Sequence, residues 1–252
     1  HTRVVADRCT LDPRADLGLG EVHFPEFTLS HAGYAGQAGR AGDASVIGDL
    51  FRRLDRSSDR EAPWLALALS GPLSGSRDGA LVTQLDARIR KGMGPMRDAL
   101  LEALAHMDAS LAGPTLVRLG RELGPRTRAK VAELLVGFPA QKEHLSSMLQ
   151  EGTATRANAV WALGFVAAEG DMEALVRMTK DADPRVAANA ATGIGRLASR
   201  SKEAVDAQGV LCPLTQSEHA AVRASAFAAV RLAGQDCEQA AIHALRDDPS
   251  PL

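Results

Sequence analysis

The chain has 252 residues, 45% of them hydrophobic and only 4% aromatic, so it can bury a sizeable core, and disorder over most of its length is excluded. Its formal net charge of −2 gives no general attraction to nucleic acid or to an anionic membrane. No window approaches the roughly 18 uninterrupted apolar residues that a membrane-spanning helix needs, so we expect a soluble protein.

The N-terminal part predicts an irregular segment followed by helices. Residues 1–26 show no periodicity, and we expect an extended arm or an end cap there. A first helix is predicted around 31–40, although each of its interior glycines costs about 1 kcal/mol relative to alanine. Helices at 45–51, 63–69 and 80–85 follow, as the second helix of one hairpin and both helices of the next.

One pattern then recurs at steps of 28 to 36 residues. It begins with an arginine; three positions later stands alanine or another apolar residue, and four positions beyond that stands an aliphatic residue. It marks the predicted first helices of five hairpins, at 96–104, 127–135, 155–163, 186–194 and 222–230, although the fourth has Ala187 in place of the arginine. Two helices of about 12 residues and two short turns need roughly this length. The period therefore predicts tandem helical hairpins.

Second helices are predicted between the first helices from aliphatic residues at i, i+1 and i+3 or i+4, which form an inward apolar stripe. These segments are 116–119, 175–178, 211–214 and 241–245. The longest step between first helices is explained by extra residues near 199–208, in the loop between the two helices of one hairpin. Pro213 would then lie in the first turn of its helix, where its missing N–H is tolerated.

Capping and turn residues support the same predicted helix boundaries. Asp183 would cap a helix that begins at Pro184, and Asp171 would cap the second helix that follows it. The pairs Gly113-Pro114 and Gly124-Pro125 are expected to break the chain between helices.

Two segments, Asp183-Pro184-Arg185-Val186 and Val222-Arg223-Ala224-Ser225-Ala226, each followed by a second helix, resemble the short bacterial HEAT repeats, also called PBS-lyase-type HEAT repeats. The resemblance is good from about residue 94 to the end and fainter over 27–90. It implies an all-α fold, an α-α superhelix or HEAT-repeat solenoid of about seven hairpins over 27–252. The last residues look like the opening of another repeat, so we expect the array to continue beyond them.

A single hairpin cannot bury its own apolar face, so each unit of such an array is stabilised mainly by stacking on its neighbours. The recurring alanine should lie where two helices pass closely, and the aliphatic position that follows should lie in the continuous core. These residues are Ala159, Ala190 and Ala226, and then Leu163, Ile194 and Val230. Gly193-Ile194-Gly195 is expected to be helical and not a phosphate-binding loop.

Two sets of polar residues are candidates for function. Arg97, Arg128, Arg156 and Arg223 form an arginine column, which we interpret as a structural ladder to acids or carbonyls of neighbouring turns. In a HEAT solenoid the second helices line the concave face, where two rows would make a mildly basic ridge. These rows are Arg118, Ser147, Arg177 and His243, and then Arg121, Gln150, Lys180 and Arg246.

This ridge has two interpretations. It is a solvated helix face partly neutralised by Glu122, Asp181 and Asp247, or it recognises an acidic protein surface. From the second we expect a non-enzymatic scaffold or adaptor that binds a protein partner on its concave face, with no catalytic residue, cofactor or metal. HEAT repeats also occur in bilin lyases, a di-iron hydroxylase and a DNA glycosylase, so a bilin-lyase-like or other HEAT-type enzyme subunit and a nucleic-acid-binding protein remain alternatives.

The enzymatic alternatives find little support in single residues. Glu143-His144 and Glu218-His219 have the reverse of the His-Glu order of HEAT-type di-iron hydroxylases and occur at unlike places in the repeat. Trp64 and Trp161 lie among alanines and leucines, and we expect both to pack in the interior instead of stacking on bases.

The three cysteines show no CxxC pair. We expect Cys9, Cys212 and Cys237 to be ordinary structural thiols, and a Cys212–Cys237 bridge stays open. The compartment stays open as well, with the cytoplasm preferred.

Overall fold

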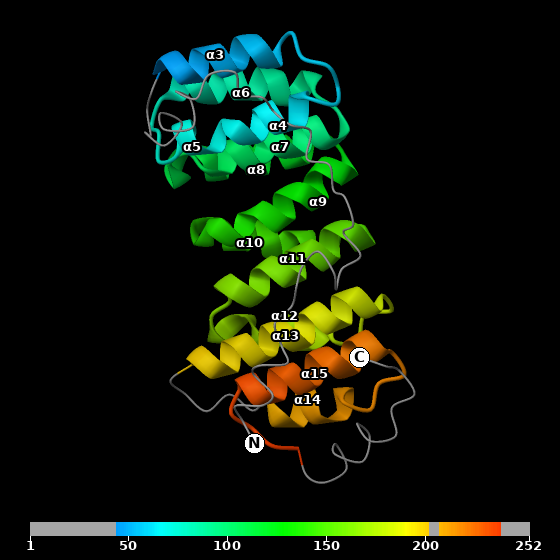
Figure 1. Ribbon diagram of the computed structural model, residues 1–252. Helices are drawn as coiled ribbons and strands as arrows, with labels where there is room; N and C mark the ends of the chain where they lie inside the picture. The colour runs from blue at the N-terminus through cyan, green and yellow to red at the C-terminus, as the bar shows by residue number, and fades with distance from the viewer. Residues whose placement is uncertain (1–43, 202–206, 238–252) are drawn as a thin grey trace, which may run out of the picture. The chain divides into compact units, whose positions relative to one another are not determined.

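The computed structural model describes residues 44–201 and 207–237. The chain divides into two units, His1–Gly39 and Arg40–Leu252, and all that follows concerns the second. The predicted arm at 1–26, the helix around 31–40 and the helix at 241–245 lie outside the described residues, as does Cys9. Within the described ranges the protein is all-helical and has no strand (Figure 1).

Four helices precede the clear repeats. They are α3 (Ala44–Leu54), α4 (Ala62–Ala68), the short α5 (Ser70–Leu73) and α6 (Gly79–Lys91). These bounds confirm the helices predicted at 45–51, 63–69 and 80–85. α3 packs against α4 and α5, and α4 packs against α7, the first helix of the next hairpin.

The five predicted first helices are all present. They are α7 (Gly94–Ala105), α9 (Pro125–Leu134), α11 (Thr153–Val166), α13 (Pro184–Arg200) and α15 (Ala220–Leu232). Second helices alternate with them, namely α8 (Ala109–Glu122), α10 (Lys142–Met148), α12 (Met172–Met178) and α14 (Gln208–Leu214). Short 3-10 turns lie at Leu135–Gly137, Pro139–Gln141 and Glu169–Asp171.

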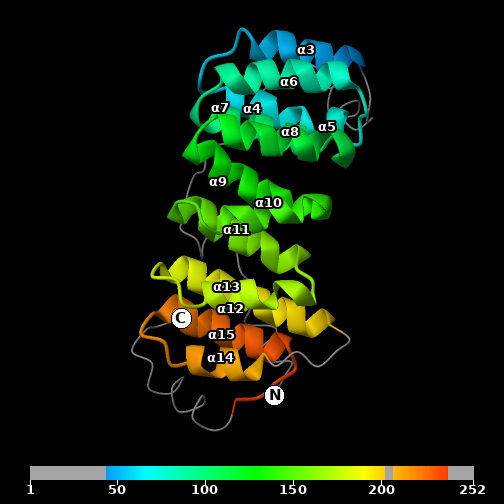
Figure 2. The same cartoon turned by 180° about the vertical axis from the view of Figure 1, so that it is seen from behind.

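Neighbouring hairpins pack on one another in chain order. Each first helix contacts the next, from α7 through α9, α11 and α13 to α15. The second helix α12 contacts the first helices on either side of it, α11 and α13, and α14 contacts α13 and α15 in the same way. The views in Figures 1 and 2 agree with this order.

Most buried apolar side chains form one continuous cluster from Ile47 in α3 to Cys237 after α15, and Ala187, Ala188 and Val222 form a small second one. The predicted core residues Leu163, Ile194 and Val230 belong to the continuous cluster. The recurring alanines at 159, 190 and 226 are completely buried. Sharing of one apolar cluster by successive hairpins is what a stack of mutually stabilising units requires.

Two helix crossings depend on glycine. A β-carbon added to Gly164 of α11 would lie 2.7 Å from Cα of Gly193 in α13, and one added to Gly195 would lie 2.6 Å from Cα of Ala229 in α15. The segment Gly193-Ile194-Gly195 is therefore a helical stretch through which α13 approaches both neighbours, as its assignment to a helix predicted.

The turn predictions are confirmed at two places. The Asp183 carboxylate accepts a hydrogen bond from the Arg185 N–H at 2.9 Å, and α13 begins at Pro184. Gly124 has a φ of +88°, a conformation that suits glycine, and α9 begins at Pro125 immediately after it.

The break predicted at Gly113-Pro114 is wrong, because α8 runs through both residues. The helix begins earlier, where the Asp108 carboxylate accepts from the Ser110 N–H at 3.0 Å. Pro114 then falls in the second turn and removes only one backbone hydrogen bond. Gly113 serves packing, since an added β-carbon would lie 3.2 Å from the Phe138 ring.

Two smaller predictions also need correction. Pro213 lies near the end of α14, because this seven-residue helix begins at Gln208. The extra residues before it do not all form a loop, because α13 continues to Arg200. The Asp171 side chain does not cap α12; its carboxylate accepts from the Ala168 N–H at 2.7 Å and pairs with Lys142 at 2.8 Å.

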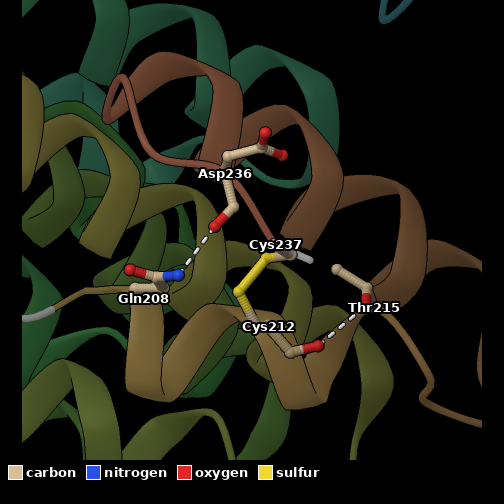
Figure 3. The surroundings of a disulfide bond; sticks show 5 residues. All are labelled: Gln208, Cys212, Thr215, Asp236 and Cys237. Atoms are coloured by element: carbon tan, nitrogen blue, oxygen red, sulfur yellow. Dashed lines mark hydrogen bonds between the residues drawn. A yellow bond between two sulfur atoms is a disulfide. The ribbon is translucent and has the colours of Figure 1, made fainter. Parts of the chain in front are cut away.

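Cys212 and Cys237 form a disulfide, with their Cα atoms 5.6 Å apart. The expectation of ordinary thiols is therefore wrong for this pair. Beside the bridge, the Gln208 side chain donates to the Asp236 carbonyl at 2.7 Å, and the Thr215 hydroxyl donates to the Cys212 carbonyl at 2.7 Å (Figure 3). The chain that follows α15 is thus fastened to α14.

Candidate interaction surface

The predicted ridge residues lie on the second helices or just after them. Arg118 and Arg121 are on α8, Ser147 is on α10, and Arg177 is on α12; Gln150 and Lys180 follow their helices by two residues. All six are exposed, while Leu116, Leu145 and Leu175 of the same helices are completely buried. His243 and Arg246 lie outside the described residues.

The charge of Arg118 is neutralised by its neighbours. Its guanidinium lies 2.7 Å from the Asp86 carboxylate of α6 and 3.4 Å from Glu122. Arg90 of α6 pairs with the same two acids, at 2.7 Å from Asp86. Partial burial would raise the pKa of Asp86, but the hydrogen bonds from Arg90 and Arg118 outweigh it and lower that pKa. Two cations and two anions therefore join α6 to α8 and leave no excess charge.

The middle of the ridge carries one cation, Arg121, whose described partner is a histidine and not a carboxylate. Arg121 donates from Nη2 to Nδ1 of His144 on α10 at 3.0 Å, so the accepting nitrogen carries no proton. Ser147 donates its hydroxyl hydrogen to the His144 carbonyl at 2.7 Å. The contact between Arg121 and His144 joins α8 to α10, and that of Ser147 lies within α10.

The remaining positive charge of the ridge is concentrated after α10. Arg177 is 60% exposed, and its guanidinium lies 3.9 Å from the highly exposed Glu173, a separation at which an exposed pair contributes little. Lys180 has no carboxylate within ion-pair distance in the described part of the chain. Asp181, which was expected to neutralise this part of the ridge, pairs with Arg156 at 2.6 Å.

The arginine column makes contacts within the fold. Nε of Arg97 donates to the Ile89 carbonyl and Nε of Arg128 to the Gly120 carbonyl, each at 3.1 Å and each eight residues back. Arg223 donates to the Ser217 and Glu218 carbonyls, at 2.8 and 3.0 Å.

The column also reaches the turns that follow the second helices α10 and α12. Arg128 pairs with Glu151 at 2.8 Å, and Arg156 donates to the Glu151 carbonyl at 2.7 Å. Arg156 pairs in turn with Asp181, after the next second helix. These are the contacts of a ladder that fastens each first helix to the turns around it.

A second ladder was missed by sequence reasoning. The amide of Asn158 donates to the Ala129 carbonyl at 2.8 Å, and the amide of Asn189 donates to the Ala157 carbonyl at 2.9 Å. Each asparagine therefore joins its first helix to the preceding one. The available signal was its recurrence in two successive repeats, two residues after the arginine position.

The two tryptophans differ in their surroundings. Trp161 is half-buried, and its ring meets that of Phe165 edge to face with centroids 4.9 Å apart. Trp64 is 48% exposed, so the expectation that it packs in the interior is wrong. The reason is its place on α4, where Ala62 and Ala66 form the buried face.

The two Glu-His pairs have other contacts. Glu143 is exposed, and its neighbour His144 binds Arg121. His219 lies 3.5 Å from Glu218, at the start of α15. Among the residues that the structure describes, no three His, Cys, Asp or Glu side chains gather as a metal site would require. No described helix is long and apolar enough to cross a membrane.

Comparison with known proteins adds no assignment: no protein-family model matches this chain, and no curated protein matches it.

Proposed function

We propose that this chain is a non-enzymatic protein-binding scaffold of the HEAT type, a solenoid that holds an acidic partner on the exposed face of its second helices, around Arg177 and Lys180. The observation that carries the proposal is a contrast within the ridge. The charge of Arg118 is compensated by Asp86 and Glu122. Arg177 has one weak contact with an acid, and Lys180 has no described carboxylate within ion-pair distance.

The repeated contacts support the solenoid. The arginine contact to a carbonyl eight residues back occurs in two successive hairpins, and the asparagine contact to the preceding first helix also occurs twice. Contacts repeated at the same offset indicate that successive hairpins are placed by similar translations and rotations, which is the rule that generates a superhelix.

The charge distribution supports the kind of partner. Exposed cations without a local acid raise the positive potential above one face, and such a patch accelerates and orients the approach of an acidic surface. The overall charge of −2 does not oppose this, because most other arginines of the described part have carboxylates or carbonyls as partners.

The test is affinity capture with the full chain from an extract of its source, compared between two double variants. Arg177→Glu with Lys180→Glu reverses the charge of the patch. Arg53→Glu with Arg56→Glu makes the same charge change at exposed residues at and just beyond the end of α3. We expect the first variant to weaken binding of the captured partner by roughly tenfold or more, equivalent to about 1.4 kcal/mol, and the second to bind normally.

Thermal melting of both variants provides the control for folding, and we expect both to melt close to the parent because the changed residues are exposed. Equal capture by the two variants at low salt would contradict the proposed site. Arg118 is left unchanged in this experiment because its reversal would also break the contacts between α6 and α8.

A further inference from the structure

The outward side of three first helices carries a row of side chains at one repeat position, nine residues after the arginine position. The row consists of Phe165 on α11, Arg196 on α13 and Leu232 on α15, and is called the outer row below. Phe165 is 41% exposed and Leu232 is 49% exposed, so both offer apolar surface to a partner.

The helix register places these three side chains side by side. The guanidinium of Arg196 lies 3.7 Å from the centre of the Phe165 ring. The crossing of Gly164 on Gly193 has the same offset in the repeat as the crossing of Gly195 on Ala229. Since α15 follows α13 in the register in which α13 follows α11, the position of Leu232 relative to α13 matches that of Arg196 relative to α11.

Arg196 differs from the arginines of the column because, among the described residues, neither a carbonyl nor a carboxylate accepts a hydrogen bond from its guanidinium, whereas Arg97 and Arg128 each donate to a carbonyl. Its neighbour Arg200 donates to the Gly164 and Ala167 carbonyls, at 3.2 and 2.9 Å, and so brings no negative charge. Partial burial and the charge of Arg200 lower the pKa of Arg196. A partly desolvated cation without a counter-ion is unfavourable, and an anion placed against it would relieve that cost.

The Phe165 ring lies on one side of this guanidinium, and no described group accepts a hydrogen bond from its N–H groups. An arginine that lies flat on an aromatic ring still directs its N–H groups outward in its own plane, where a carboxylate can accept two of them. Trp161 contacts the Phe165 ring from the side and holds it in place. Arginine and aromatic residues gathered in this way are typical of the energetic centre of a protein interface.

We propose that the outer row binds an extended acidic segment of a partner protein, whose carboxylate pairs with Arg196 while apolar side chains on either side of it contact Phe165 and Leu232. Packed helices lie about 8–10 Å apart, and an extended segment of polyproline II type advances about 3.1 Å per residue with three residues per turn, so that every third side chain lies on one face, about 9 Å apart. The segment should therefore carry an apolar residue, an acid and a second apolar residue at roughly every third position. This proposal rests on the proposed binding function but uses the first helices instead of the second.

Trp161 provides a direct signal for occupation of the row. The chain has two tryptophans, so Trp64→Phe leaves Trp161 as the only indole. The probe is a short synthetic peptide with Leu, Glu and Leu at every third position and Ser between them, and its counterpart has Gln in place of Glu. We expect a saturable change in Trp161 emission with the Glu peptide and roughly tenfold weaker binding of the Gln peptide.

Variants of the full chain then locate the contact. Arg196→Gln in the Trp64→Phe background should weaken binding of the Glu peptide by roughly tenfold, whereas Arg177→Gln in the same background should leave it unchanged. Circular dichroism of each variant checks that it is folded. No saturable change up to about 1 mM peptide, or equal affinity for the Glu and Gln peptides or for parent and Arg196→Gln, would overturn the proposal.

A second copy of this chain is the competing occupant. If sedimentation shows a dimer that Leu232→Ser abolishes, the row is a contact between copies and the proposal fails. The capture experiment separates the two proposals. If Arg177→Glu with Lys180→Glu loses the partner and Arg196→Gln keeps it, the second-helix site stands and the outer row does not bind that partner.

Discussion

Replacement of Gly195 by alanine should destabilise the protein, because the added methyl group would meet the backbone of α15. The new β-carbon would lie 2.6 Å from Cα of Ala229, and 2.7 Å from both its Cβ and its carbonyl oxygen. Carbon atoms in contact normally lie about 3.5–4.0 Å apart, so α13 and α15 would have to separate by roughly 1 Å. No side-chain rotation can relieve this contact, since two of the three atoms belong to the backbone.

The magnitude follows from two opposing effects. Overpacking of a core costs about 1–3 kcal/mol, and a crossing of two helix backbones belongs at the upper end of that range. Alanine is favoured over glycine inside a helix by about 1 kcal/mol. The expected net loss is therefore about 2 kcal/mol, which lowers the melting temperature of a domain of this size by about 4–8 °C.

Gly48 provides the matched control. It lies inside α3, and a β-carbon added there would find only the end of the Arg52 side chain, at 3.8 Å. Gly48→Ala should therefore stabilise the protein by up to about 1 kcal/mol. Both variants are compared with the parent by calorimetry and by urea unfolding followed by circular dichroism. A Gly195→Ala protein that melts at or above the parent would show that α13 and α15 do not approach as closely as described.

Three further predictions concern the core, the disulfide and a helix cap. Leu163→Asp should lower the free energy of unfolding by about 4 kcal/mol or more, because Leu163 is completely buried, and a variant that melts within a degree or two of the parent would contradict this register. Reduction of the bridge between Cys212 and Cys237, 25 residues apart, should cost about 3.5 kcal/mol, measured as a loss of urea stability with dithiothreitol that the double serine variant does not show. Hydrogen bonds from Arg185 lower the pKa of Asp183 to about 2, so the contribution of this carboxylate to stability is present above about pH 4 and is lost as the pH falls toward 2. The Asp183→Asn variant should therefore have a lower melting temperature than the parent at neutral pH and the same melting temperature at the acidic limit.

The all-helical fold could be predicted from the sequence because its signal is local and repeated. Four of the five first helices of the clear repeats contain the whole predicted segment, and α9 ends one residue before the end of its segment, where a 3-10 turn begins at Leu135. The prediction from sequence was wrong where a contact with a residue distant in the chain determines the local structure. Gly113-Pro114 has the composition of a turn, yet Gly113 lies inside α8 and gives room to Phe138 from the next hairpin.

The candidate surfaces were less predictable because their charges depend on pairs between helices. Arg118 and Arg177 occupy the same row of the ridge, but only Arg118 has a well-placed acid from another helix, and nothing in the periodicity distinguishes them. The surroundings of Arg196 were equally unpredictable from the sequence. Its contact with the Phe165 ring depends on how α11 is aligned with α13. The glycine crossing determines this alignment, and the composition of the chain does not reveal it.

The sulfur–sulfur bond between α14 and the chain after α15 also bears on where the molecule works. Such bonds persist in secreted and periplasmic surroundings and are reduced by glutathione and thioredoxin in most cytosols. The bridge would therefore last in an oxidising compartment and would be reduced in most cytosols. In reducing surroundings the hairpin of α14 and α15 would lose this covalent link and would depend on its apolar packing and hydrogen bonds alone.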